Sequence, residues 1–375
     1  DLHSFPTRRS SDLWQRELLE WDETLRFAVQ NPTIRALAEL VHAKRQEAET
    51  GESESGPTPQ GSGREKTVTL LSLRAGSEGW SRLFLIPDGT ATIAGFNPLL
   101  SRLDQRLHVS ALTPASVDAY LSIPPAELIP TLARWYVHAL ETDGSEFPFI
   151  CGSCMGGLVA LEVARLLERN NKHLGAVAVI NSVKPPYTIN DSLLSYLTFI
   201  QEIRIAPLTL GIDVHAIGRA VAAVIGQGED IPERAVLTHL PPESPTHAAC
   251  QSIATMSREE RLTKAFELYS QSPGFSGTMP RSRLDGIFRV VEHSIQGVNA
   301  YVPRAVESAV TLFRREEEDA FLIPLGRLMR EFWEQYAGGG LHVVNLPGNH
   351  WTSMQASGAT IIADGLFALA KGGSS

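Results

Sequence analysis

The sequence has little cysteine. Its three cysteines among 375 residues, Cys151, Cys154 and Cys250, are too few for a disulfide framework. We therefore expect a reducing compartment, in which a cysteine with a special role is a reactive group rather than a crosslink. Cys151 and Cys154 lie close together in the chain, which makes this short segment the first candidate for chemistry.

Long apolar runs and basic blocks are also lacking. No stretch reaches the roughly 18 uninterrupted apolar residues that a membrane-spanning helix requires, and the first residues lack the apolar core of a signal peptide. Lys and Arg number 33 against 42 Asp and Glu, a net charge of −9, and no basic segment is long enough to follow a phosphate backbone. We expect a cytoplasmic protein whose partners are neither nucleic acid nor membrane.

The apolar content, 43% of the chain, is sufficient for one large domain with additional segments. Residues 1–13, DLHSFPTRRSSDL, have no periodicity and resemble translated adapter sequence, so we exclude them as an artefact. Residues 14–46 predict two short helices, and residues 47–65, rich in Glu, Ser, Gly and Pro, predict a flexible linker. The main domain covers residues 66–372.

In the main domain, short apolar strands alternate with helices. We predict strands at residues 67–73, 82–87, 108–112, 147–152, 175–181 and 308–314, and a last strand in the segment LHVVNLPGNH, residues 341–350. This alternation is typical of α/β proteins with a mostly parallel sheet covered by helices on both faces. Residues 187 to about 300 interrupt it with a helical segment that lacks a convincing buried strand, which predicts an insertion.

The segment FPFICGSCMGGLVALEVARLL, residues 147–167, carries the main chemical motif. A buried strand leads into GSCMG and directly into a helix, which is the G-x-S-x-G pattern of a nucleophile elbow with cysteine at its centre. The central residue of such a turn is held at positive φ, and a Cβ on a neighbour would collide there. Gly152, Gly156 and Gly157 meet that requirement.

The position of Cys154 favours a nucleophile. A helix N-terminus gives a cysteine thiolate character, and the exposed backbone N–H groups there can hold a developing oxyanion. The alternatives are a Cys-x-x-Cys redox pair with Cys151 and an ordinary buried cysteine. The glycine placement, the length of the chain and the apolar strand around Cys151 favour the nucleophile, with Cys151 as a packing residue.

Such a nucleophile needs a histidine on a late loop and an orienting residue before it in the chain. His350 follows the last predicted strand in the turn LPGNHW and is the candidate base. Asn181 ends the strand GAVAVIN and can accept a hydrogen bond from imidazole. Asp319, after the strand TLFRR, is the alternative. We favour Asn181 because a thiolate and an imidazolium need orientation more than charge.

Together these motifs resemble the C-terminal thioesterase domain of nonribosomal peptide and polyketide synthases, an alpha/beta-hydrolase family. The resemblance covers residues 66 to about 372. It rests on RLFLIPDG, ARWYVHAL, FPFICGSCMGGLVALEVARLLE, LGAVAVINSVKPP, NAYVP, VTLFR and VVNLPGNHWTSM, in the family's order and spacing. Residues 14–46 resemble the last two helices of an acyl or peptidyl carrier domain, without its modified serine.

The resemblance implies roles for individual residues. Cys154 would be the nucleophile, His350 the base, and Asn181 would stand where the family usually has aspartate. Backbone N–H groups of Met155 and Gly89 would form the oxyanion hole, and the insertion at about 187–300 would be a lid over the acyl chain. Serine is usual where Cys154 stands, so two of three positions depart from the family together, which indicates a coordinated cysteine variant.

We therefore predict a chain-releasing thioesterase. It would take an acyl or peptidyl chain from the phosphopantetheine thioester of an upstream carrier domain onto Cys154 and release it by cyclisation or hydrolysis. We predict no metal site and no cofactor bound by the domain itself. The alternatives are a catalytically weak carrier-binding domain and, less favoured, a thiol oxidoreductase using Cys151 and Cys154. The lid sequence specifies neither the acyl chain nor the mode of release.

Overall fold

The structure is a computed structural model that describes residues 67–144, 148–226, 230–271, 279–317 and 325–372. The predictions for residues 1–13, 14–46 and 47–65 lie outside the described residues, as does Asp319. Within the described ranges, no helix combines the length and the apolar character needed to cross a lipid bilayer.

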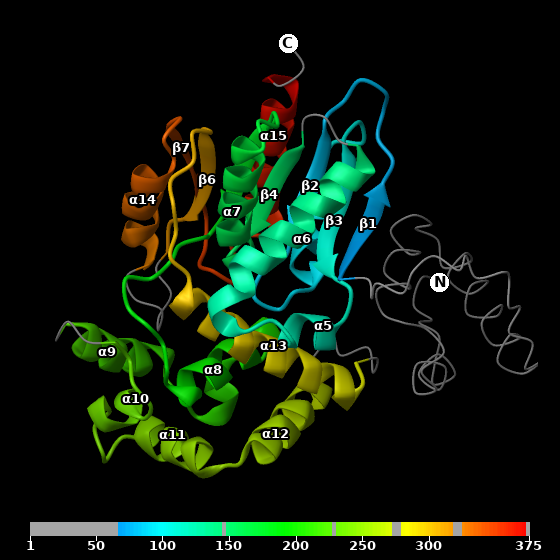
Figure 1. Cartoon of the computed structure of the whole chain (residues 1–375). Helices are drawn as coiled ribbons and strands as arrows, with labels where there is room; N and C mark the ends of the chain where they lie inside the picture. The colour runs from blue at the N-terminus through cyan, green and yellow to red at the C-terminus, as the bar shows by residue number, and fades with distance from the viewer. Residues whose placement is uncertain (1–66, 145–147, 227–229, 272–278, 318–324, 373–375) are drawn as a thin grey trace, which may run out of the picture.

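The centre of the domain is a seven-stranded sheet with the order β1-β3-β2-β4-β5-β6-β7 (Figure 1). Its strands are β1 (Val68–Arg74), β2 (Arg82–Ile86), β3 (His108–Pro114), β4 (Phe149–Ser153), β5 (Ala176–Ile180), β6 (Val310–Arg315) and β7 (Leu341–Leu346). Only β1, at one edge, pairs antiparallel, and the other described pairs are parallel. The prediction of a mostly parallel sheet is confirmed.

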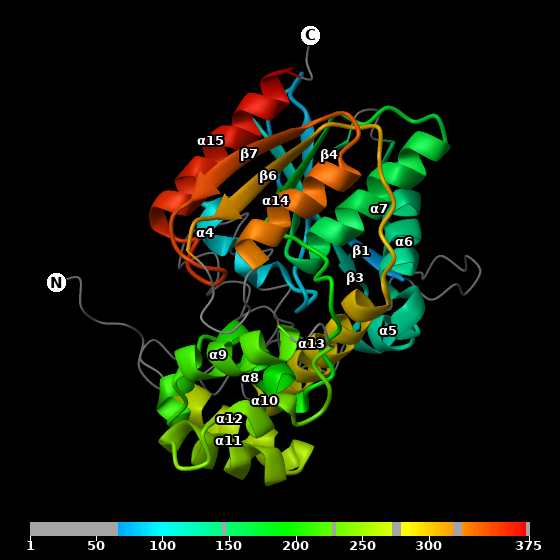
Figure 2. The same ribbon diagram turned by 90° about the vertical axis from the view of Figure 1, so that its left-hand side faces the viewer.

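Helices cover both faces of the sheet (Figure 2). Each face has its own apolar core. One face carries α6 (Leu128–Asp143), α7 (Met155–Arg169) and α14 (Leu325–Tyr336). The other carries the short helices η1 (Ile93–Phe96) and α4 (Asn97–Leu100) together with α15 (Ala356–Gly372). The apolar strand residues alternate between the two cores, since Val179 faces α7 and the adjacent Ile180 faces α15.

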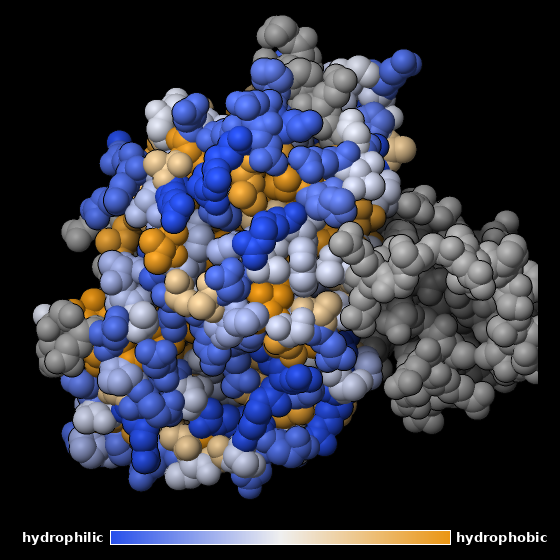
Figure 3. All heavy atoms as spheres, in the orientation of Figure 1, coloured by the Kyte–Doolittle hydropathy of each residue, from blue (hydrophilic) through white to orange (hydrophobic). Residues whose placement is uncertain are grey.

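The insertion between β5 and β6 is helical, and we call it the lid. It contains α8 (Ser192–Glu202), η3 (Pro207–Leu210), α9 (Val214–Ile225), α10 (Ala235–His239), α11 (Pro245–Thr255), α12 (Arg258–Gln271) and α13 (Arg281–Ala300). The lid lies beyond the carboxyl ends of the parallel strands (Figures 1 and 2). On the face shown in Figure 3, its surface is mainly hydrophilic, with hydrophobic residues in small groups.

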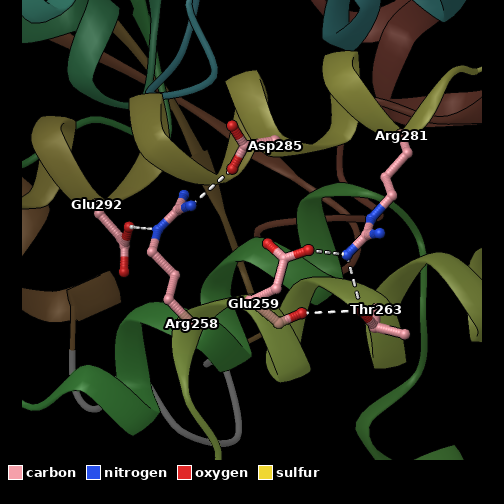
Figure 4. A network of polar contacts seen from close by, with 6 residues as sticks. All are labelled: Arg258, Glu259, Thr263, Arg281, Asp285 and Glu292. Atoms are coloured by element: carbon pink, nitrogen blue, oxygen red, sulfur yellow. Dashed lines mark hydrogen bonds and ion pairs between the residues drawn. The ribbon is translucent and has the colours of Figure 1, made fainter.

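An aromatic core and a polar network hold the lid helices together. Phe199 on α8 stacks on Phe288 on α13 with ring centroids 4.5 Å apart. Arg258, at the start of α12, donates two hydrogen bonds to α13, from Nη1 to Asp285 Oδ1 at 2.6 Å and from Nε to Glu292 Oε2 at 3.2 Å (Figure 4). Its guanidinium also lies over the Phe288 ring, 4.6 Å from the centroid. A network in which one guanidinium contacts two carboxylates and a ring stabilises the fold more than an isolated surface ion pair does.

The remaining short elements connect the sheet to the lid. Between β3 and α6 the chain forms α5 (Val117–Leu121) and η2 (Pro125–Glu127), and both pack against α13. Ser116 caps α5, because its hydroxyl accepts a hydrogen bond from the Ala119 N–H at 3.0 Å. The side chain of Tyr120 on α5 is consequently held against the lid.

Candidate active site

The turn between β4 and α7 has the geometry of a nucleophile elbow. Cys154 has φ 51° and ψ −120°, so the positive φ expected for the central residue is present. A Cβ on Gly152 would lie 2.1 Å from the Gly156 carbonyl oxygen, and one on Gly156 would lie 2.2 Å from the Pro87 carbonyl oxygen. A Cβ on Gly157 would lie 2.4 Å from Ser182 Cβ. The sharp turn thus packs so tightly that only glycine fits at these three positions.

One pocket of about 130 Å³ gathers the residues that the sequence singled out. Cys154 and Met155 reach it from the elbow, Asn181 from the end of β5, His350 from the loop after β7, and Gly89 from the loop after β2. These elements are far apart in sequence, but the carboxyl ends of parallel strands meet at one edge of the sheet. The lid closes the other side of the pocket with largely apolar side chains, among them Val291, Ile295 and Val298.

Asn181 is buried, 4% exposed, and held in a defined orientation. Its backbone has φ 48°, a left-handed conformation that asparagine tolerates well. The side-chain oxygen accepts a hydrogen bond from the Arg315 backbone N–H at 2.9 Å, and the amide nitrogen donates to Ser353 Oγ at 2.6 Å. An amide oxygen has two lone pairs, so this arrangement leaves one acceptor site for an imidazole N–H.

The lid contacts the loop that carries His350. Arg204, just after α8, donates from Nη1 to the Trp351 carbonyl oxygen at 2.7 Å. Glu202, at the end of α8, accepts a hydrogen bond from the Trp351 indole N–H at 3.3 Å. Both contacts are to the residue that follows His350, so α8 and the histidine loop are joined directly.

Burial and nearby charge control the protonation of Cys154. Burial raises the pKa of its thiol to about 12, and the carboxylates of Glu202 and Asp88 add to the rise. A hydrogen bond from the Met155 N–H and the charge of Arg315 oppose it without cancelling it. Burial therefore acts against the thiolate character expected from the helix N-terminus, because it disfavours the charged form.

His350 is likewise kept neutral. Burial lowers the pKa of its imidazole to about 3, and the positive charges of Arg315 and Arg204 contribute to the decrease. At neutral pH the site therefore holds a thiol and a neutral imidazole. A neutral imidazole can accept the thiol proton when Cys154 attacks a carbonyl carbon.

Cys151 has the packing role that the sequence predicted. It is fully buried in β4, pairs in register with Leu85 and Ala178, and belongs to an apolar core cluster. Burial alone raises the pKa of its thiol strongly. Cys151 and Cys154 are both free thiols.

Several polar groups at the site were not predicted. Arg315, 1% exposed, ends β6 and lines the pocket, and Glu202 and Ser294 reach it from the lid. Burial raises the pKa of Glu202 to about 8, with Asp88 as the next cause. A second pocket of about 260 Å³ adjoins the first at Asn181, Glu202, His350 and Trp351. Among the described residues, no group of three or more His, Cys, Asp or Glu side chains is arranged to hold a metal ion.

A protein-family model described as "Thioesterase domain" matches residues 81–369. Pyochelin synthetase PchF of Pseudomonas aeruginosa is 27% identical over 341 residues, which is 88% of this chain and 18% of that protein. The chain therefore spans less than a fifth of the length of this curated relative.

Two solved structures resemble the fold. Holo-AB3403, a four-domain nonribosomal peptide synthetase bound to AMP and glycine, superposes with a TM-score of 0.58 at 15% identity, over 89% of this chain and 22% of that chain. The Vlm2 thioesterase domain with 2,3-diaminopropionic acid and a bound dodecadepsipeptide gives a TM-score of 0.51 at 14% identity, over 80% of this chain and 97% of that one. Likenesses at this identity show the fold alone, and they agree with the predicted alpha/beta-hydrolase fold.

Proposed function

The chain belongs to the thioesterase domain family and is therefore an enzyme of acyl transfer or hydrolysis. From this premise we propose that it releases an acyl or peptidyl chain from the phosphopantetheine thioester of a carrier domain. Cys154 is the nucleophile in this proposal. The observation that carries the proposal is the pocket shared by Cys154, His350, Asn181, Met155 and Gly89. A nucleophile, a base, an orienting amide and two backbone donors at one site are the parts that acyl transfer requires.

In the first step, the Cys154 sulfur attacks the thioester carbonyl carbon while His350 accepts the thiol proton. The oxyanion that forms is stabilised by the N–H groups of Met155 and Gly89. When the intermediate collapses, the bond to the phosphopantetheine sulfur breaks, and that sulfur leaves as a thiol with the proton held by His350. Asn181 orients the imidazole so that the same ring can accept and then donate the proton.

In the second step, water or a nucleophile within the chain attacks the acyl group on Cys154. His350 accepts the proton of the attacking group and returns it to the cysteine sulfur as that sulfur leaves. Water gives a free acid, and an internal amine or hydroxyl gives a ring. The domain itself binds no cofactor in this scheme, because the phosphopantetheine arrives with the carrier.

The cysteine favours ring closure. Transfer from the carrier to Cys154 exchanges one thioester for another, so the acyl group remains more electrophilic than a serine ester would be. A weak or strained internal nucleophile can still attack it, provided that water is restricted. The pocket is lined mostly by apolar groups and covered by the lid, which supports ring closure over hydrolysis.

The test is to incubate the full chain with a carrier protein loaded with acyl chains that bear an internal amine or hydroxyl, and to weigh the products. We expect a cyclic product, and none from a Cys154→Ala variant. A product that is always heavier than the ring by one water would leave hydrolysis as the reaction. Stable carrier binding without any product would support the alternative of a carrier-binding domain, and a reversible Cys151–Cys154 disulfide after mild oxidation would support the oxidoreductase.

A further inference from the structure

Two buried hydroxyl groups lie behind the loop that carries Gly89. Tyr120 on α5 is 1% exposed and Ser294 on the lid helix α13 is 3% exposed. Their oxygen atoms are 2.7 Å apart, within hydrogen-bond distance. Buried hydroxyls cost free energy unless they are paired, so this pair needs a structural or catalytic reason.

The neighbours of the pair fix the direction of its hydrogen bonds. Ser294 Oγ lies 2.7 Å from the carbonyl oxygen of Gly89 and 2.7 Å from that of Val290, one helical turn earlier. Carbonyl oxygens only accept, so the single hydroxyl hydrogen of Ser294 must be directed at them. Tyr120 is therefore the donor to Ser294. The Tyr120 hydroxyl is also 3.8 Å from the sulfur of Met155.

The contact with Gly89 matters because glycine is the residue whose backbone rotates most freely. The two residues after Gly89 both bond back to Asp88. The Thr90 N–H donates to the Asp88 carboxylate at 2.9 Å, and the Ala91 N–H donates to the Asp88 carbonyl oxygen at 3.0 Å. Ser294 shares its hydroxyl hydrogen between the carbonyl oxygens of Gly89 and Val290, and its bond to Gly89 restrains rotation on the C-terminal side of the Gly89 Cα. A Cβ on Gly89 would lie 3.4 Å from Ser294 Cβ, so the lid helix packs directly on this loop.

We propose that Tyr120 and Ser294 are positioning residues for the oxyanion hole. The Gly89 carbonyl and the Gly89 N–H belong to different peptide units, one on each side of the Gly89 Cα. The Ala91 N–H holds the unit that carries the Gly89 N–H, through the Asp88 carbonyl oxygen, and Ser294 holds the next unit, through the Gly89 carbonyl oxygen. With both units held, the Gly89 N–H points at the developing oxyanion together with that of Met155. This inference rests on the proposed function, because the oxyanion role of Gly89 belongs to that proposal. Ser294 is part of the lid, so the oxyanion hole is complete only when α13 packs on the Gly89 loop, and lid closure is coupled to the chemical step.

Two reactions of Cys154 separate this role from a structural one. Acylation by an N-acetylcysteamine thioester forms an oxyanion, whereas alkylation by iodoacetamide displaces iodide directly and forms none. Both rate constants are measured by intact-protein mass spectrometry on the full chain with Ser294→Ala, Tyr120→Phe or both changes. Ser282→Ala, an exposed serine on the same helix, is the matched control.

We expect Ser294→Ala and Tyr120→Phe each to slow acylation by about tenfold to a hundredfold, with the loss in kcat rather than KM. Alkylation should change by less than about twofold, since preorganised donors act only on the oxyanion. The double variant should be no slower than the slower single variant, because the two hydroxyls act as one unit. Ser282→Ala should match the unmodified chain in both reactions.

Unchanged acylation in both variants would overturn the inference. Acylation and alkylation that fall together would also overturn it, because they would show that the hydroxyls only maintain the fold or the Cys154–His350 pair. The proposed function fails in a different way, namely by acyl transfer to the protein that persists in Cys154→Ala.

Discussion

The thiol of Cys154 and the imidazole of His350 are both driven toward their neutral forms. Burial raises the pKa of the thiol to about 12, and burial lowers that of the imidazole to about 3. Glu202 and Asp88 disfavour a thiolate when they are ionised, and Arg315 disfavours an imidazolium. Proton transfer is therefore expected to accompany attack on the substrate rather than to precede it.

This protonation state predicts the pH dependence of alkylation. A thiol whose pKa lies near 12 has a thiolate fraction that rises about tenfold per pH unit below that value. The iodoacetamide rate constant of the free enzyme should therefore climb continuously between about pH 7 and pH 10, after subtraction of the Cys154→Ala background. A plateau that begins below pH 8 would indicate a preformed thiolate–imidazolium pair instead.

The neutral amide of Asn181 suits a thiol better than a hydroxyl. Cys154→Ser should lower thioester turnover by at least about a hundredfold, because a serine–histidine pair needs a carboxylate to stabilise the imidazolium. Adding Asn181→Asp should recover about tenfold of that loss, since the new carboxylate would stand where Asn181 now faces the site. Turnover of an N-acetylcysteamine thioester measures both effects.

Asp319 is the alternative orienting acid, and the same variants test it. If Asp319 supplies the charge, Cys154→Ser should keep most of its activity and Asn181→Asp should add nothing. Asp319→Ala should then be more harmful than Asn181→Ala, whereas orientation by Asn181 requires the reverse order.

The candidate site residues share one property, which is that local sequence patterns single them out. Cys154 is flanked by glycines that only a tight turn requires, and His350 follows an apolar strand in a Pro-Gly turn. Arg315, Glu202 and Ser294 carry no such local signal. They reach the pocket only because the lid folds over the end of the sheet. The raised pKa of the Cys154 thiol has no local signal either, because burial depends on distant segments.

At the scale of elements, α8 is tied to the loop that carries His350. The bonds from Arg204 to the Trp351 carbonyl and from the Trp351 indole to Glu202 join the lid to that loop. Together with the bond from Ser294 on α13 to Gly89, they connect the lid to the loops that carry His350 and Gly89. Movement of the lid should therefore disturb both loops at once.

Arg204→Ala should lower turnover by about tenfold, because it removes a charged hydrogen bond that holds the histidine loop. It also removes a positive charge that lowers the pKa of His350. The acidic limb of the pH–rate profile should therefore move to higher pH. Arg219→Ala is the control, since Arg219 on α9 is exposed and contacts Asp213 at only 3.8 Å. Identical pH profiles for both variants would contradict the role of Arg204.

The elements of the sheet were predictable because strand and helix periodicities are local. All seven predicted strands are present. The bounds of the first six differ from the prediction by two residues or fewer at each end, and the last strand occupies the first part of the segment predicted for it. The sequence showed that the lid is helical, but not how its helices pack. The stacking of Phe199 on Phe288 and the contacts of Arg258 with Asp285 join residues that are distant in the chain. No periodicity predicts such pairs.

At the scale of the whole molecule, the pocket lies between the carboxyl edge of the sheet and the lid. The strand ends carry Cys154, Asn181 and the loop of His350, and the lid supplies the apolar wall and the contacts to the loops of His350 and Gly89. Under the proposed function, changes in the lid alter this wall while the strand ends keep Cys154 and His350 in place.

The central claim is that Cys154 carries the acyl group. The most direct test is to react the full chain with an N-acetylcysteamine thioester, quench with acid and map the modified peptide by mass spectrometry. We expect one acyl group, attached to Cys154, and no adduct in Cys154→Ala, whose circular dichroism should match that of the unmodified chain. An acyl group on Ser153 or on another residue, or equal loading of Cys154→Ala, would contradict the assignment of Cys154 as the nucleophile.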